Sequence, residues 1–174
     1  MQQTFLIADT HFGHKRIIEY DEHRQNYTSL HEMDEAIIKN WNKVIKRNYI
    51  VYILGDVSFY PKEKTKEIIN RLNGNKYLIM GNHDTTHSVN WWKEVGFEWV
   101  SKYPIIFEDK YILSHIPIFR VGDAPQNLFW NVHGHLSSHG SLYNNDTHYS
   151  VSMHMGYDTP INLKKIKKYF EEEI

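Results

Sequence analysis

The stretch Thr4-Phe5-Leu6-Ile7-Ala8-Asp9-Thr10-His11 introduces the pattern on which the whole chain is built. A short apolar run, typical of a buried strand, leads directly into a carboxylate and an imidazole. Later apolar runs end in the same way, at Gly55-Asp56, Gly81-Asn82-His83-Asp84, Ser114-His115 and His133-Gly134-His135. Five predicted strand ends therefore carry side chains that can bind a metal ion.

Predicted strands and helices alternate over much of the chain. One helix is expected to begin at Ser29, whose side chain can cap the first turn, a second near Pro61, and a third after Asn162. Alternating strands and helices, followed by consecutive strands, predict an α/β protein with mixed sheets covered by helices. The predicted strands are Thr4–Ala8, Ile50–Leu54, Tyr77–Met80, Tyr103–Phe107, Tyr111–Leu113, Phe129–Val132 and Tyr149–Met153.

The composition limits the function classes that need to be considered. With 174 residues the chain has the usual size of one domain. Its 20 basic and 21 acidic residues nearly cancel, so no overall field draws it to nucleic acid or to an anionic membrane. Cysteine is absent, which leaves nitrogen and oxygen as the metal ligands. No basic leader or membrane-length apolar run is present, so we expect a cytoplasmic protein without a membrane partner.

The polar strand ends are expected to meet at one place. Ligands of open α/β sheets collect beyond the carboxyl ends of the strands. Alternation along an extended segment would put Asp9 and His11 on the same side, where both can hold one ion. Asp56 is the best candidate to bridge two ions, and Asn82 can add an amide oxygen. Each fragment alone is more often a turn or a cap, and only their combination points to a metal centre.

In this order, Asp9-x-His11, Gly55-Asp56, Gly81-Asn82-His83-Asp84, His115 and Gly134-His135 resemble the calcineurin-like metallophosphoesterase superfamily. Asp9-Thr10-His11-Phe12-Gly13-His14-Lys15 and Glu32-Met33-Asp34-Glu35 further resemble its small single-domain bacterial and phage branch. The resemblance implies a four-layer αββα sandwich of two mixed β-sheets flanked by helices. It also implies one domain over residues 1–174, without a cap domain.

Two divalent metal ions are implied by the same resemblance. One would be held by Asp9, His11 and Asp56, and Asp56 would bridge to the other. The remaining ligands of the second ion would be Asn82, His115 and His135. Mn²⁺ is favoured, and Fe²⁺, Zn²⁺ or Ni²⁺ also suit such oxygen and nitrogen donors.

The chain departs from the family at Gly134-His135-Leu136-Ser137, where a second histidine usually stands in place of Ser137. We take His139 as the ligand that replaces it. A weak contact from Ser137 or water, or a partly empty first site, are the alternatives. His133 and His154 are not counted among the expected ligands.

Phosphoester hydrolysis is the activity that the resemblance implies, through attack by a hydroxide that bridges the two metals. His83 would act on the leaving group, Asp84 would orient its ring, and His14 would touch the substrate phosphate. Only 25 residues separate Asp56 from Asn82, which leaves no room there for a large cap. An open site follows, and it favours phosphodiesters.

Two other function classes remain open. A catalytically weak or inactive scaffold of the same fold would bind metal and a protein partner, but it has no use for His83. A nuclease would require a basic, aromatic-lined track, for which Trp91-Trp92-Lys93 and Lys164–Lys168 are available. A small phosphate ester is the expected partner, nucleic acid is not favoured, and the sequence leaves the oligomeric state unknown.

Overall fold

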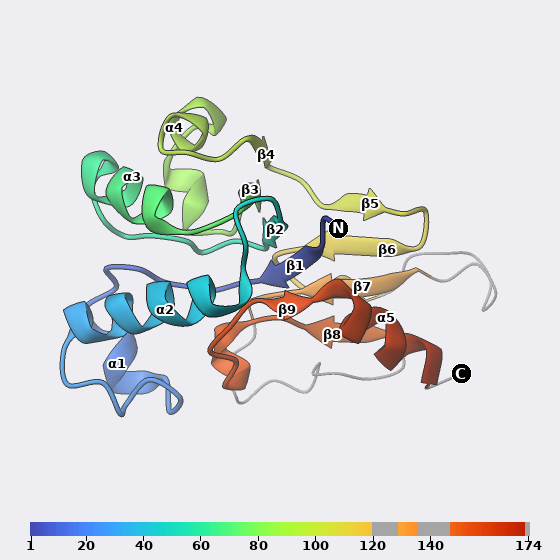
Figure 1. The fold of residues 1–174 in the computed structure, drawn as a ribbon, viewed down its shortest axis with the longest axis horizontal. Helices are drawn as coiled ribbons and strands as arrows, with labels where there is room; N and C mark the ends of the chain where they lie inside the picture. Colours follow the sequence, from blue (N-terminus) through green and yellow to red (C-terminus); the bar gives the residue numbers. More distant parts are fainter. Residues whose placement is uncertain (120–128, 136–146, 173–174) are drawn as a thin grey trace.

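The strands of the computed structural model form two mixed sheets (Figure 1). Residues 1–119, 129–135 and 147–172 are described. The first sheet has the order β4-β3-β2-β1-β9, formed by Trp99–Ser101, Asn75–Ile79, Ile50–Ile53, Thr4–Ile7 and Ile161–Asn162. The second has the order β5-β6-β7-β8, formed by Ile105–Phe107, Tyr111–Ser114, Trp130–His133 and His148–Ser150.

Helices flank these sheets. They are α1 Ile17–Tyr20, α2 Leu30–Val44, α3 Lys62–Arg71, α4 Val89–Glu94 and α5 Leu163–Glu172. In Figure 1, α2, α3 and α4 lie together on one side of the molecule, and α5 lies on the opposite side. The three helices predicted from the sequence are present as α2, α3 and α5. As expected, Ser29 caps α2 by accepting a hydrogen bond from the Glu32 amide at 3.1 Å. No described helix is long and apolar enough to cross a membrane.

Side-chain alternation along β1 explains how the layers are joined. Phe5 and Ile7 belong to a core cluster shared with α2, α3 and α4. Leu6 and Ala8 belong to a second cluster, which includes the inner face of the other sheet and α5. The central strand is thus apolar on both faces, as expected for a parallel strand covered on both sides. The predicted α/β sandwich of two mixed sheets flanked by helices is confirmed.

The register of the strands brings their carboxyl ends together. β1, β2 and β3 are parallel, with Ile7 opposite Ile53 and Ile53 opposite Leu78. In the second sheet β6, β7 and β8 are parallel, and Ser114 pairs with His133. The two sets of strand ends are joined by a hydrogen bond of 3.0 Å from the Ala8 amide to the Val151 carbonyl. Six parallel strands therefore deliver their following loops to one rim.

Candidate metal centre

The backbone just beyond the strand ends adopts a costly conformation. Asp9, His11, Asp56 and His135 have φ values of 59°, 51°, 54° and 64°. Left-handed backbone costs a non-glycine residue about 1–2 kcal/mol and concentrates at functional sites. Alternation along an extended segment had predicted that Asp9 and His11 share one side, but the backbone at both residues is left-handed and not extended. The turns at both residues bring their side chains together instead.

Two glycines allow the loops to approach the acidic side chains closely. A β-carbon at Gly81 would lie 2.3 Å from Asp56 Oδ1. At Gly134 it would lie 2.5 Å from the Ala8 β-carbon and 3.0 Å from Asp9 Oδ2. Any larger residue would push against these neighbours. Both glycines are thus required by the space around the two carboxylates.

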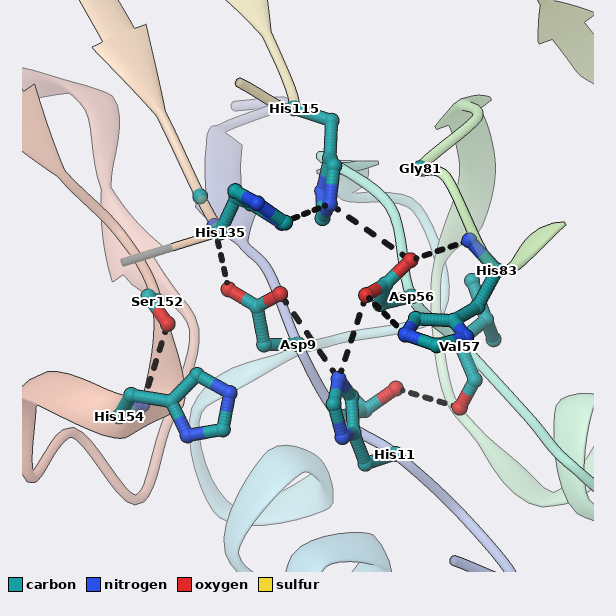
Figure 2. Close-up of polar contacts among 12 residues, drawn as sticks. Asp9, His11, Asp56, Val57, Gly81, His83, His115, His135, Ser152 and His154 are labelled. Carbon is teal, nitrogen blue, oxygen red and sulfur yellow. Dashed lines mark hydrogen bonds and ion pairs between the residues drawn. The ribbon is translucent and has the colours of Figure 1, made fainter. Parts of the chain in front are cut away.

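Asp56 lies between two groups of imidazoles (Figure 2). Its Oδ2 atom is 3.4 Å from His11 Nε2, and its Oδ1 atom is 3.6 Å from His115 Nε2. Burial acts to raise the pKa of Asp56, but the nearby imidazoles outweigh it and the pKa is lowered. Asp56 is thus an ionised carboxylate at neutral pH, with one oxygen directed to each side.

The group on one side is formed by Asp56, His115, His135 and Asn82. His115 Nδ1 donates to the Leu54 carbonyl at 2.7 Å, so the neutral ring has its lone pair on Nε2. That nitrogen is 3.0 Å from Asn82 Oδ1 and 3.0 Å from His135 Nδ1. An amide oxygen and a ring lone pair repel each other at this distance unless a cation or proton lies between them. This donor set fits a divalent ion.

The group on the other side is formed by Asp9 and His11. Asp9 Oδ1 is 3.9 Å from His11 Nε2, and Asp9 Oδ2 accepts from the His135 amide at 2.9 Å. Both ring nitrogens of His11 are buried without a hydrogen-bond partner. Burial also lowers the pKa of His11, so the ring is neutral. Unpartnered nitrogens beside a carboxylate are explained if His11 binds a cation.

The structure adds one histidine that the sequence analysis left out. Ligand atoms of Asp9, His11 and His154 all lie within 4.8 Å of one another. His154, which was not counted among the expected ligands, thus lies beside Asp9 and His11, within the 3-10 turn (η3, Met153–Met155) that follows β8 at the same rim. His139 and Ser137 lie outside the described residues. The sequence did contain a signal, since the predicted strand Tyr149–Met153 leads directly into His154, as the other runs lead into their ligands.

His83 stands at the edge of the two groups. Its side chain is 51% exposed, and Nε2 lies 3.9 Å from Asp56 Oδ2. The His83 amide donates to Asp56 Oδ1 at 3.1 Å, which holds the loop in place. His14 lies further along the rim, with its ring 5.5 Å from that of His11 and 4.5 Å from that of Phe59. His83 is thus half exposed beside the two groups, whereas His14 is partly buried against Phe59.

Asp84 has a different position from the one expected. Its carboxylate accepts from the amides of Asp56 at 2.7 Å, Val57 at 3.0 Å and Gly81 at 2.8 Å. The expectation that Asp84 orients the His83 ring is therefore wrong. Its side chain turns inward at the start of the 3-10 helix and joins the loops after β2 and β3. Burial raises the pKa of Asp84 to about 6.

Comparison with known proteins agrees with this centre. The sequence pattern of the calcineurin-like phosphoesterases matches residues 3–173. The chain belongs to the calcineurin-like phosphoesterase family. The matched residues include the strands of both sheets, and the match confirms the resemblance read from the motifs.

Three similar proteins support the family assignment and the fold. An uncharacterised protein of Methanocaldococcus jannaschii, MJ1445, is 30% identical, with 99% of this chain and 93% of that protein aligned. The gene 66 protein of Mycobacterium phage L5 is 33% identical over 71% of this chain and 58% of the phage protein. The crystal structure of the Aquifex aeolicus protein AQ665, of unknown function, has a TM-score of 0.73 at 23% identity, covering 97% and 99% of the two chains. The last comparison concerns the fold alone.

Membership in the calcineurin-like phosphoesterases assigns the chain to the metal-dependent phosphoester hydrolases in general. The side chains at the rim fit that assignment, because they offer two adjoining groups of oxygen and nitrogen donors that share Asp56. Carboxylate, imidazole and amide donors suit divalent ions of this kind.

Proposed function

We propose that the protein hydrolyses phosphodiesters with two divalent ions, preferably Mn²⁺, held on either side of Asp56. The position of this carboxylate between His11 and His115 is the observation that carries the proposal. When bound, two such ions would lower the pKa of water and neutralise charge on the phosphoryl oxygens. The protein's own groups then have to orient the ester and supply the leaving group with a proton.

His83 is suited to the proton transfer. Its ring is half exposed at the rim, while its amide is tied to Asp56. A leaving oxygen above Asp56 would lie within reach of Nε2, which can donate a proton in the imidazolium form. Asp84 bonds backbone amides, so the His83 ring is positioned instead by Phe59 and by Asp56. His14, beside Phe59, can approach a phosphate oxygen from the other side of the rim.

Space on both sides of the centre favours a diester over a monoester. A cavity of about 280 Å³ adjoins the group of His115 and Asn82, with apolar walls and one lysine, Lys102. On the opposite side, Phe59 is 38% exposed and packs against His83 at 5.1 Å between ring centroids. One ester group could occupy the cavity while the other lies on Phe59. A phosphate monoester would fill only one of these places.

We prefer a small cytoplasmic phosphodiester to nucleic acid as the substrate. The near-zero net charge gives no long-range attraction for a polyanion. A nucleic-acid track would need Trp91 and Trp92 at the surface, but Trp92 is fully buried in the core and cannot stack on a base.

The test compares hydrolysis of an aryl phosphodiester and an aryl phosphomonoester by metal-free protein reconstituted with Mn²⁺. We expect faster diester turnover, and a loss of about 10²–10⁴-fold in His83→Ala with metal binding retained. His87→Ala is the matched control, because His87 stacks on Trp91 outside both metal groups. Metal binding without turnover on either ester would instead support the scaffold, and faster monoester turnover would refute the diester preference.

A further inference from the structure

Within the described residues, the two metal groups have unequal sets of family ligands. The group of His115 has Asp56, Asn82 and His135 beside it, whereas the group of His11 has only Asp9 and Asp56. The family position that would add an imidazole is occupied by Ser137. We infer that His154 replaces the missing imidazole, binding the first ion through Nε2 while Asp21 and Arg24 hold its ring in place. This inference rests on the two-metal centre of the proposed function.

The segment that carries His154 is fixed to the end of β1. Ser152 forms an isolated bridge with Ala8, and the Met153 amide donates to the Ala8 carbonyl at 3.1 Å. Ser152 Oγ accepts from the His154 amide at 3.1 Å and caps the 3-10 turn. His154 is therefore attached to the residue that directly precedes Asp9. The contact with the end of β1 thus brings His154 close to Asp9, although the two residues are far apart in the sequence.

The ring of His154 faces the first group (Figure 2). Its centroid lies 5.1 Å from that of His11, with the ring planes at 88°. The side chain is 12% exposed, so it is mostly withdrawn from solvent but still at the rim. Two imidazoles that approach each other edge to face beside Asp9 can direct one nitrogen each to a shared ion.

Asp21 determines which nitrogen is available. His154 Nδ1 donates to Asp21 Oδ2 at 2.7 Å, which leaves Nε2 to carry the lone pair in the neutral ring. A carboxylate behind a histidine is the usual support of a metal ligand, since it fixes the tautomer and makes the ring a stronger donor. His115 has the equivalent support from the Leu54 carbonyl.

Arg24 connects this support to the first group itself. The guanidinium is 2% exposed and donates from Nε to Asp21 Oδ2 at 2.9 Å. It also donates to the Thr10 carbonyl at 2.9 Å and to the Asp9 carbonyl. One buried cation thus fixes both the backbone of Asp9 and the partner of His154. Because Asp21 is already paired with Arg24, charge balance alone does not require His154 at this place.

The experiment measures metal binding and not turnover. Apo protein is titrated with Mn²⁺ by equilibrium dialysis, and the electron paramagnetic resonance spectrum distinguishes a coupled ion pair from an isolated ion. We expect two coupled ions in the wild type and one isolated ion in His154→Ala, whose remaining ion also shows that the variant is folded. His139→Ala and the matched control His23→Ala should keep the coupled pair, since His23 lies in the same segment as Asp21 with a 40% exposed ring outside both groups.

Asp21→Asn tests the positioning role. The amide keeps the size of the carboxylate but makes a weaker support, so affinity at the first site should fall by about 10–100-fold while the second site is unchanged. A coupled pair in His154→Ala, loss of one ion in His139→Ala, or no metal in the wild type would overturn the inference. Two ions without turnover in the wild type, reduced to one in His154→Ala, would uphold the inference while the proposed function fails.

Discussion

The closest approach between a glycine and a candidate ligand predicts the effect of Gly81→Ala. The new β-carbon would lie 2.3 Å from Asp56 Oδ1, 2.7 Å from the Asp56 amide nitrogen and 2.9 Å from His115 Cε1. An ordinary contact is longer by about 1 Å, so the carboxylate has to move by that amount. Metal–ligand distances tolerate only about 0.2 Å. The substitution should therefore prevent the Asp56 carboxylate from bridging the two ions, although Asp56 itself is not mutated.

We expect Mn²⁺ affinity in Gly81→Ala to fall by at least about 100-fold, equivalent to roughly 2.7 kcal/mol. Crowding should cost about 1–3 kcal/mol of unfolding free energy as well. Isothermal titration calorimetry and urea unfolding measure the two quantities. Gly74→Ala is the control, because its φ is +88° and its β-carbon would meet Ile45 Cγ2 at 2.8 Å, far from the rim. It should lose stability but keep its affinity. Wild-type affinity and turnover in Gly81→Ala would refute the reasoning.

Two further predictions concern stability. His133 is fully buried, and burial lowers its pKa to about 4. The His133 ring binds a proton more tightly in the unfolded chain than in the folded one. The free energy of unfolding is therefore unaffected by this group above about pH 6.5, and it falls by up to about 3 kcal/mol as the pH is lowered toward 4. Urea unfolding of metal-free His133→Asn, which keeps a donor for the Gly134 carbonyl, should show a shallower acid slope than the wild type. An unchanged slope would contradict the assignment. Removal of metal should also lower the melting temperature, because an ion at 100 times its Kd adds about 2.7 kcal/mol to the free energy of unfolding. A melting curve that a chelator does not change would argue against a preformed metal site.

The sequence was sufficient where local chemistry determines the structure. The runs that form β1 and β2 are largely apolar, so both strands were predicted with bounds correct to one residue. The predicted strand at β3 began two residues late, because β3 starts with the polar pair Asn75-Lys76. β4 and β9 were missed because they have three and two residues, too few for a pattern, and form by pairing with strands already in place. The rule that polar residues follow apolar strands was enough to collect Asp9, Asp56 and His115 at one rim.

The direction of individual side chains and the contacts between distant segments could not be predicted in the same way. Asp84 follows His83 directly, yet its side chain points to the amides after β2 because a 3-10 turn begins there. His154 is joined to Asp21 across 133 positions, and nothing in either segment alone indicates the pair. These contacts depend on how the sheets pack, which sequence periodicity does not report.

The central claim is that two ions lie on either side of Asp56, and anomalous diffraction from Mn²⁺-loaded crystals tests it most directly. The account predicts two peaks about 3.5–4 Å apart, one beside Asp9, His11 and His154 and the other beside Asn82, His115 and His135. A single peak, or peaks away from Asp56, would contradict it.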